Sequence, residues 1–349
     1  MTSDPFSSRC CRVALLGFGT VGSAVARRLA ADDTPVRLTH IFDRRAAEKR
    51  RSAGLDAVSW TPDIDEVLHA DADIVVEAIG GVEPAATWIR AALAAGKSVV
   101  TANKQVIARH AAPLLAFAAQ QGRQLRFEAA VGGAMPIVRA IGDGLAGDRI
   151  VAIDAILNGT TNAVFTAIDA TGCSLAAAVR TAQARGYAEA DPAADLDGDD
   201  ARAKLAILCA LAFGLRVDPS AIGGISCAST TAADFTRARL RGATIRQVAH
   251  ADFDRVTATL TAWVAPIEVA STSLFGRTVG PQNAAIITGA HSGEIGIFGA
   301  GAGGEATAVA ILSDIAAIAR DRAAIVPPPV LTANFILQTS DFVPAEVAC

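Results

Sequence analysis

Short apolar runs alternate with helix-like segments over the first hundred residues of the chain. The predicted strands are 13–17, 36–42, 73–77 and 98–101, and the predicted helices are 22–30, 46–51, 64–69 and 84–95. Short apolar strands separated by helices are typical of a parallel sheet that is covered on both faces. The first part of the chain is therefore predicted to be an α/β domain.

The pattern changes after the glycine pair at 132–133. The predicted strands of this second part are 150–157, 256–269 and 284–288, and the predicted helices are 164–169, 175–184, a long apolar helix ending at Gly214, and 306–320. We place the domain boundary near residue 135, which gives a first domain of residues 1–135 and an α+β domain of residues 136–304. The C-terminal helix, about 305–325, is expected to pack back on the first domain.

Composition narrows the class of protein. The 349 residues carry a net charge of −4, with 52% hydrophobic and 19% charged residues. The apolar fraction excludes a disordered chain, and the lack of a block of like charge argues against binding to nucleic acids or anionic membranes. The longest strongly apolar run, 205–215, is too short to cross a bilayer, and no apolar segment precedes Arg9 as in a secretory signal. We therefore expect a cytoplasmic protein.

The six cysteines and five histidines are scattered along the chain. They form no C-x-x-C pair and no H-E-x-x-H helix. A zinc site and a disulfide framework are therefore not expected, and each histidine is interpreted as a surface residue or a hydrogen-bonded core residue.

A glycine-rich turn, Gly17-Phe18-Gly19-Thr20-Val21-Gly22, joins the first predicted strand to the first predicted helix. In such a loop the first glycine permits the tight turn, the second lets the backbone approach a pyrophosphate, and the third lets helix and strand pack closely. The phosphates then rest on the helix N-terminus. Because Asp43 ends the second strand about 20 residues further on, the loop predicts a dinucleotide site.

The residues after the second strand give opposing indications about the cofactor. Asp43 favours NAD, since a carboxylate accepts bonds from both ribose hydroxyls and repels a 2′-phosphate. Arg44 and Arg45 favour NADP, since guanidinium groups recognise phosphate. We predict NAD as the cofactor and keep NADP as the alternative.

Two lysines stand out by position. Lys104 directly follows the fourth strand, at the sheet edge where ligands of open α/β sheets bind. Asp200 and Lys204 are four residues apart on one predicted helix face, with the acid N-terminal to the base. A half-buried lysine beside a carboxylate is suited to proton transfer. The spacing is equally consistent with acids that solvate a loop and favour a helix N-terminus.

With these residues in place, the chain resembles the homoserine dehydrogenase family over residues 12–320. The motifs that carry the resemblance are the Gly17–Gly22 loop, Val76-Glu77-Ala78-Ile79-Gly80-Gly81, Thr101-Ala102-Asn103-Lys104, Phe127-Glu128-Ala129-Ala130-Val131-Gly132-Gly133, Leu157-Asn158-Gly159-Thr160-Thr161-Asn162, Gly186-Tyr187-Ala188-Glu189-Ala190-Asp191-Pro192, and residues 299–307. Only 45 residues follow Gly304, so the resemblance is to the short form without a C-terminal regulatory domain.

The resemblance implies a Rossmann-type nucleotide domain and an α+β domain that binds the substrate and supplies the interface of a homodimer. It further implies interconversion of L-homoserine and L-aspartate 4-semialdehyde with NAD(P), a reaction of threonine and methionine biosynthesis. The implied catalytic residues are Lys204, Lys104 and Asp200, and the implied substrate pocket is Gly159, Thr160, Tyr187, Glu189 and Asp195. The implied cofactor residues are Gly17, Phe18, Gly19, Thr20, Val21, Gly22, Asp43, Arg44, Ala78, Gly80, Thr101, Asn103, Lys104 and Gly304. The resemblance also implies a sodium ion on the backbone carbonyls of Glu128, Val131, Gly133 and Met135.

The chemistry of homoserine suits these residue types. Its ammonium group needs a carboxylate such as Glu189, and its carboxylate group suits the backbone N–H groups of Gly159 and Thr160. Oxidation of its alcohol requires a group that takes the hydroxyl proton. We assign proton transfer to Lys204 and substrate positioning to Lys104, and expect folding to bring both lysines to one substrate molecule.

The chain departs from the family pattern at several positions, including Ala163 and Asp199. Asp199 adds a charge next to the catalytic acid, and a small residue at 163 would reshape the pocket. Two alternatives therefore remain open. One is an NAD(P)-dependent dehydrogenase of another small amino acid or hydroxy acid, and the other is a nucleotide-sensing module without catalysis.

Overall fold

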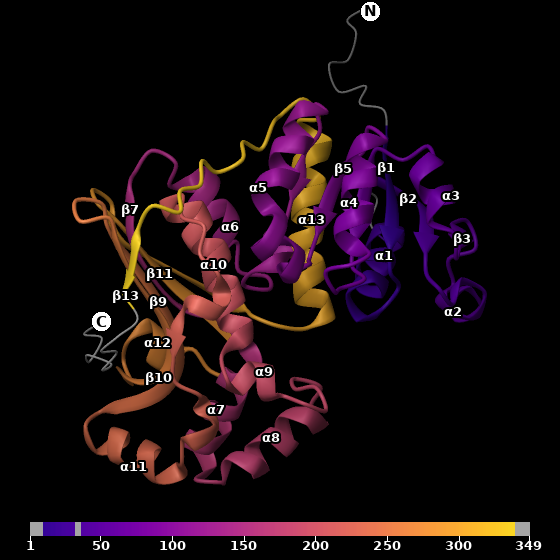
Figure 1. Cartoon of the computed structure of the whole chain (residues 1–349). Coiled ribbons are helices and arrows are strands. Elements are labelled where there is room, and N and C mark those ends of the chain that lie inside the picture. The colour runs from indigo at the N-terminus through magenta and orange to yellow at the C-terminus, as the bar shows by residue number, and fades with distance from the viewer. Residues whose placement is uncertain (1–9, 32–35, 339–349) are drawn as a thin grey trace, which may run out of the picture. The chain divides into compact units, whose positions relative to one another are not determined.

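The computed structural model describes residues 10–31 and 36–338, and the chain divides into two compact units. Unit 1 comprises Met1–Ala130 and Gly304–Pro328, and unit 2 comprises Val131–Gly303 and Pro329–Cys349. The orange-yellow helix α13 therefore belongs with the indigo and purple elements from the first third of the chain (Figure 1). The division falls at Ala130, five residues before the sequence-based boundary, and residues 329–338 return to unit 2.

Unit 1 contains a six-stranded parallel sheet of order β3-β2-β1-β4-β5-β6. Its strands are β1 (Cys11–Leu16), β2 (Val36–Phe42), β3 (Ser59–Thr61), β4 (Ile74–Glu77), β5 (Ser98–Thr101) and β6 (Leu125–Arg126). Its helices are α1 (Thr20–Ala31), α2 (Ala46–Ala53), α3 (Ile64–His69), α4 (Ala85–Ala94), α5 (Lys104–Gln120), the 3-10 turn Glu128–Ala130, and α13 (Gly304–Arg320). This strand order is that of a doubly wound dinucleotide-binding sheet.

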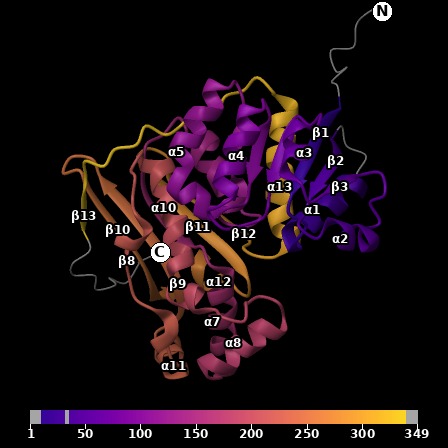
Figure 2. The same cartoon turned by 45° about the vertical axis from the view of Figure 1, so that its right-hand side comes forward.

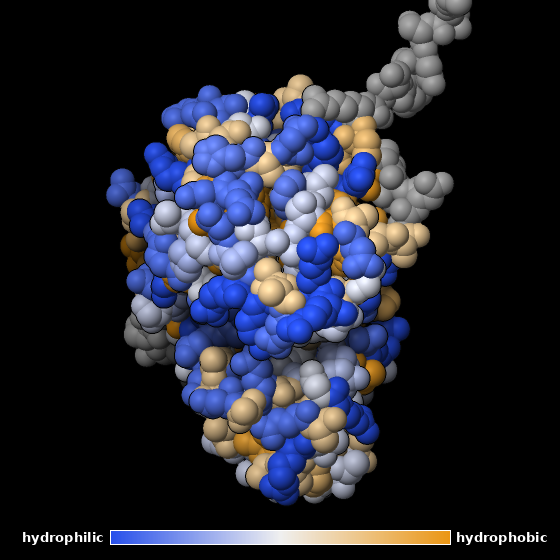
Figure 3. All heavy atoms as spheres, turned by 90° about the vertical axis from the view of Figure 1, so that its right-hand side faces the viewer, coloured by the Kyte–Doolittle hydropathy of each residue, from blue (hydrophilic) through white to orange (hydrophobic). Residues whose placement is uncertain are grey.

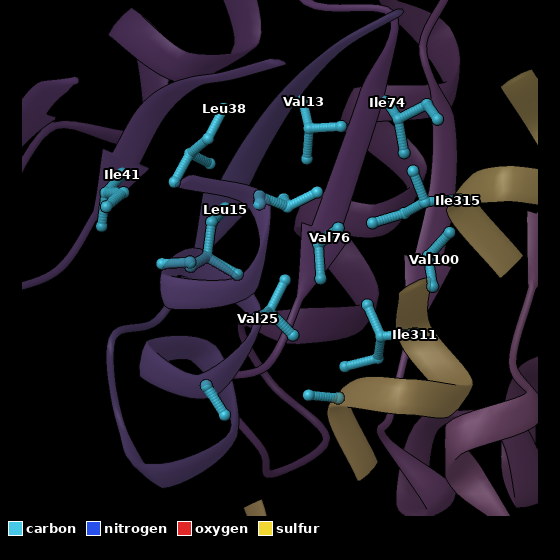
Figure 4. Close-up of a cluster of buried hydrophobic side chains, with 14 of the residues drawn as sticks. Val13, Leu15, Val25, Leu38, Ile41, Ile74, Val76, Val100, Ile311 and Ile315 are labelled. Carbon is cyan, nitrogen blue, oxygen red and sulfur yellow. The ribbon is translucent and has the colours of Figure 1, made fainter. Parts of the chain in front are cut away.

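Strand periodicity places the core of unit 1. Val13 and Leu15 on β1 point to one face of the sheet, where Ile311 and Ile315 of α13 pack against them in a cluster of buried apolar side chains (Figure 4). Leu16 points to the opposite face and is also fully buried. Both faces are thus covered, which is why these strands read as continuous apolar runs.

Unit 2 contains a mixed seven-stranded sheet in which β12-β11-β7-β9-β10 form an antiparallel series. The strands β13 and β8 both pair with β10 in parallel. The bounds are β7 (Ile150–Ile156), β8 (Gly223–Gly224), β9 (Ala243–Asp254), β10 (Thr259–Ala270), β11 (Gln282–Gly289), β12 (Gly293–Ala300) and β13 (Ile336–Gln338). Figure 2 shows β9, β11 and β12 of this sheet above the helices α7, α8 and α11.

The helices of unit 2 form a second layer against this sheet. Their bounds are α6 (Ile137–Arg139), the π-turn Ala140–Gly144, α7 (Gly159–Thr171), α8 (Leu175–Ala184), α9 (Ala193–Leu196), α10 (Asp199–Phe213), the 3-10 turns Pro219–Ala221 and Cys227–Ser229, α11 (Ala232–Leu240) and α12 (Leu274–Arg277). Phe165 of α7 and Phe235 of α11 meet edge to face, with ring centroids 5.4 Å apart, and anchor the packing of α7, α8 and α11.

Several sequence-based elements need correction. The predicted strand 256–269 begins too early, because residues 255–258 form the turn between β9 and β10, with Ala258 in the left-handed region (φ 52°). The strand β9 was not predicted, because polar residues such as Arg246 and Gln247 interrupt its apolar pattern. The helix α5 and the strand β12 were also not predicted. The strand β12 was missed because its glycines interrupt the strand pattern.

Among the described residues, no helix combines the length and apolar character that a membrane span requires. On the face shown in Figure 3, hydrophilic side chains dominate and hydrophobic ones are scattered.

Candidate active site

The glycine loop of unit 1 has the geometry of a phosphate cradle. Gly17 has φ 97°, and a Cβ there would lie 2.8 Å from the carbonyl oxygen of Ala78. A Cβ on Gly22 would lie 2.0 Å from the Gly17 oxygen, so only glycine lets α1 start so close to β1. Gly19 is exposed and faces open space. Gly304 packs against Thr20, where an added Cβ would lie 2.8 Å from the Thr20 carbonyl oxygen. These residues fit a dinucleotide pyrophosphate on the N-terminus of α1.

The carboxylate of Asp43 is already engaged by the protein. Its Oδ2 accepts hydrogen bonds from the Phe18 N–H (3.0 Å) and from Lys49 Nζ (2.5 Å), and its Oδ1 accepts one from the Arg45 N–H (2.9 Å). Burial raises the pKa of Asp43, but the bonds from Lys49, Arg45 and Phe18 outweigh it, so the pKa lies below its usual value. Asp43 is thus ionised and paired with a lysine, while the neighbouring Arg44 is exposed.

A buried network shapes the loop after β4 and the start of α5. Glu77 is fully buried, and its carboxylate accepts bonds from the Ile79 N–H (2.9 Å) and the Thr101 hydroxyl (2.5 Å). Asn103 caps α5, and its Nδ2 donates to the Gly81 carbonyl (2.6 Å). The network therefore ties the 78–81 loop, which contains Ala78 and Gly80, to the helix that begins with the half-buried Lys104.

In unit 2, Lys204 and Asp200 form the ion pair that their spacing predicts. Lys204 Nζ lies 2.6 Å from Asp200 Oδ2, and the two side chains are 13% and 6% exposed. Lys204 also donates to the Leu157 carbonyl (2.8 Å). Asn158 Nδ2 donates to the same Asp200 oxygen (2.8 Å) and to Asp195 Oδ1 (2.7 Å). A lysine held in this way between a carboxylate and a carbonyl can transfer a proton, since its ammonium form releases one and its neutral amine accepts one.

The predicted pocket residues Thr160 and Tyr187 are also linked, because the Thr160 hydroxyl donates to the Tyr187 carbonyl (2.7 Å). Gly159 begins α7, where a Cβ would lie 2.8 Å from the Pro281 carbonyl oxygen. Asn162 holds the loop that contains Pro281, since its Nδ2 donates to three carbonyls of this loop: Thr278, Gly280 and Gln282. The N-terminus of α7 is therefore fixed next to the Lys204 pair.

Other predicted residues are less closely engaged. Glu189 is exposed, and its backbone carbonyl accepts a bond from Gln183 Nε2 (3.0 Å). Asp199 is ion-paired to Arg202 (2.5 Å) with its side chain 67% exposed, so its charge is compensated on the surface of α10. Ala163 is half-buried in α7.

The segment predicted to bind sodium turns sharply at Gly132 and Gly133, which have φ 86° and 65°. The Met135 carbonyl accepts a hydrogen bond from the Ile137 N–H (2.8 Å). Glu128 is buried, and its backbone N–H donates to Asp314 (2.8 Å). Within residues 10–31 and 36–338, no group of three or more His, Cys, Asp and Glu side chains is arranged to hold a metal ion.

Sequence comparison now places the chain among known proteins. The family model described as "Homoserine dehydrogenase" matches residues 136–316, and that described as "Homoserine dehydrogenase, NAD binding domain" matches residues 17–128. The chain belongs to the homoserine dehydrogenase family. The resemblance, the α/β fold class and the NAD(P)-binding domain predicted from the sequence are thereby confirmed.

Individual family members support this assignment. The homoserine dehydrogenase of Mycobacterium leprae is 40% identical over 324 residues, which cover 89% of this chain and 72% of that protein. The crystal structure of a homoserine dehydrogenase from Thiobacillus denitrificans has a TM-score of 0.86 and 31% identity, covering 94% of this chain and 79% of that one. A hyperthermophilic archaeal homoserine dehydrogenase, solved in complex with NADPH, has a TM-score of 0.74 and 28% identity, with coverages of 90% and 99%.

The predicted residues thus form two groups, the cofactor residues with Lys104 in unit 1 and the substrate residues with Lys204 in unit 2. Sequence reasoning did not single out Asn158, Lys49 or Glu77. Asparagine is a favoured N-cap residue, but the predicted helix 164–169 begins five residues after the observed start of α7 at Gly159, so Asn158 was not recognised as its cap. No such local signal marks Lys49 or Glu77. Their partners, Asp43 for Lys49 and Thr101 for Glu77, lie outside the helix or strand that carries each residue.

Proposed function

We propose that this chain oxidises L-homoserine to L-aspartate 4-semialdehyde, and catalyses the reverse reduction, with NAD or NADP. The observation that carries the proposal is the buried Lys204–Asp200 pair, with Lys204 Nζ 2.6 Å from the carboxylate and next to the N-terminus of α7. The bound nicotinamide supplies the hydride acceptor. The alternative of a module without catalysis gives no reason for burying this ion pair, since removing two charges from water is costly.

In the proposed reaction, Lys204 takes the hydroxyl proton as the carbon-bound hydrogen leaves as hydride. In the reverse direction its ammonium group returns the proton to the carbonyl oxygen. Asp200 holds the lysine side chain in place, and the backbone N–H groups of Gly159 and Thr160 bind the substrate carboxylate. Glu189 binds the substrate ammonium.

The remaining assignments follow the resemblance. Tyr187 and Asp195 line the pocket, Lys104 positions the substrate, and a sodium ion is held by the 128–135 segment. We also propose that NAD is the preferred cofactor, that the enzyme is a cytoplasmic homodimer, and that unit 2 supplies the dimer interface.

The test is a steady-state assay with L-homoserine, following NAD(P)H absorbance with each cofactor and with sodium or potassium as the only monovalent cation. Lys204→Met should reduce kcat by at least about 100-fold, because proton transfer by a positioned side chain contributes on the order of 10²–10⁴. Arg202→Met removes a cation from the same helix and is the matched control, with expected near-normal turnover.

A Lys204→Met enzyme with normal kcat would disprove the proton-transfer role. Turnover of other small amino acids or hydroxy acids in place of homoserine would favour the second dehydrogenase function, and cofactor binding without any turnover would favour a sensing module. A dependence of the rate on sodium that potassium does not reproduce is the expected result for the ion site.

A further inference from the structure

Asn158 lies where three elements of unit 2 meet. It is the N-cap of α7, and its side chain reaches Asp195 on α9 and Asp200 on α10. The residue is 4% exposed, so its amide is removed from bulk water. A buried side-chain amide in such a place needs all of its polar atoms paired, since an unpaired one costs about 1–3 kcal/mol.

The hydrogen bonds fix the orientation of this amide. Its Oδ1 accepts from the Thr161 N–H (2.8 Å), which only an acceptor can do. Ionised Asp195 and Asp200 can only accept, so the Nδ2 group must face them. The Oδ1 atom can therefore only face the Thr161 N–H, and the Nδ2 group can only face the two carboxylates. Asparagine supplies the one acceptor and the two N–H donors that this position requires.

The same amide also separates two acids. Asp195 and Asp200 both lie within hydrogen-bond distance of one Nδ2 atom, and Lys204 pairs with Asp200. Two carboxylates near each other tend to bind a proton, unless donors or cations favour their ionised forms. The donor group of Asn158 bridges the two carboxylates without adding charge.

We propose that Asn158 is a positioning residue of the reaction, which holds the Asp195 and Asp200 carboxylates on one donor group and thereby keeps Asp200 paired with Lys204. This inference rests on the proposed function of Lys204. Two charged groups lie near Lys204: Asp200 on its own helix α10, and Asp195 on α9. Its other partner, the Leu157 carbonyl, is neutral, and so is the Asn283 amide that donates to that carbonyl (3.3 Å).

The substitution Asn158→Asp separates this role from helix capping. Aspartate is as good an N-cap as asparagine, so the bond to Thr161 is retained and α7 keeps its start. The two donors to Asp195 and Asp200 are lost, and a third carboxylate is added beside the pair. Negative charge favours the ammonium form of Lys204, so a higher pH is needed to generate the neutral amine.

We expect the acidic limb of the pH profile for homoserine oxidation to move up by about one pH unit in Asn158→Asp, since an added charge of opposite sign shifts a neighbouring titration by this order. The alkaline limb of aldehyde reduction should move up too, because that direction uses the ammonium form. At pH 7 the kcat of oxidation should fall about tenfold or more. A purely structural role would lower the melting temperature without moving either limb.

Asn162→Asp is the matched control, because it makes the same change one turn further along α7. The Asn162 amide donates to carbonyls of the 278–282 loop and to neither acid. We expect a lower melting temperature and unmoved pH limbs. If Asn158→Asp does not fold, Asn158→Ser keeps the cap without adding charge. Loss of the two donors weakens the support that Asp200 gives to the ammonium form of Lys204, so a downward shift of both limbs is expected.

Unmoved limbs in the folded Asn158 variants would overturn the inference. The wild-type profile separates this failure from that of the proposed function. If the wild-type enzyme does not oxidise homoserine, the proposed function fails, whereas an active wild type with unshifted variants leaves that function standing and removes the role of Asn158.

Discussion

Asp43 shows how one residue can have a different role in the fold from the one its position indicates. An acidic residue at the end of β2 favours NAD because it accepts bonds from ribose hydroxyls. Here Lys49 and two backbone N–H groups use three of the roughly four acceptor positions of the carboxylate. The lysine also offsets the negative charge that would repel a 2′-phosphate. At the residue scale, Lys49 therefore weakens the preference for NAD.

Replacing Lys49 tests this effect. In Lys49→Gln the uncompensated carboxylate should bind ribose hydroxyls better and repel a 2′-phosphate more strongly. We expect the ratio of Kd for NADPH to Kd for NADH to rise about tenfold, or about 1.4 kcal/mol, measured by titrating NAD(P)H fluorescence. Arg50→Gln removes an exposed cation from the same helix α2, and should change the ratio less. An unchanged ratio in Lys49→Gln would contradict this account.

At the scale of elements, β9 is held to its neighbours by a half-buried polar group. His250 on β9 bonds Asp154 of β7 through Nδ1 (2.7 Å) and Asp252 through Nε2 (3.0 Å), and it stacks on Trp263 of β10. Burial lowers the pKa of His250, but the two carboxylates outweigh it and raise the pKa to about 9. The imidazolium thus links three strands of the sheet.

This ion cluster predicts a pH-dependent stability. The pKa of histidine in an unfolded chain is about 6.5, so the folded state binds the proton more tightly. The full contribution is present below about pH 6.5 and is lost as the pH rises through about 9, with a total on the order of 3 kcal/mol. Urea unfolding should show wild-type stability falling over this range relative to His250→Gln. Parallel pH curves for the two proteins would rule out the predicted linkage.

At the scale of the whole molecule, the dimer proposal directs attention to the edge of the unit 2 sheet. The strand β12 pairs with β11 alone in the described part of the sheet, and Phe298 on it is 66% exposed. An exposed edge strand with an aromatic residue favours association with another chain. This observation supports the proposal that unit 2 supplies the interface.

We expect a solution mass of about 71 kDa, twice the 35.6 kDa of the chain, by light scattering coupled to size exclusion. Phe298→Glu should shift the protein towards the monomer, since it places a charge on the edge strand. Val256→Glu, in an exposed turn of the same unit, is the control and should leave the mass unchanged. A wild-type monomer would remove the proposed interface, and a dimer that tolerates both changes would place it elsewhere.

Short-range chemistry was enough to determine much of this protein from its sequence. The parallel sheet of unit 1 follows from apolar strands buried on both faces, the cradle from glycines spaced for a tight turn, and the Lys204–Asp200 pair from the pitch of a helix. Each of these depends on residues close together in the chain, so local periodicity reveals it.

Only the tertiary structure decided which distant groups compensate one another. The pairing of Asp43 with Lys49, the sharing of Asn158 between Asp195 and Asp200, and the course of β9 through polar residues depend on burial and on neighbours from other elements. A polar side chain can lie in a core only where such partners meet it, and no local pattern specifies them.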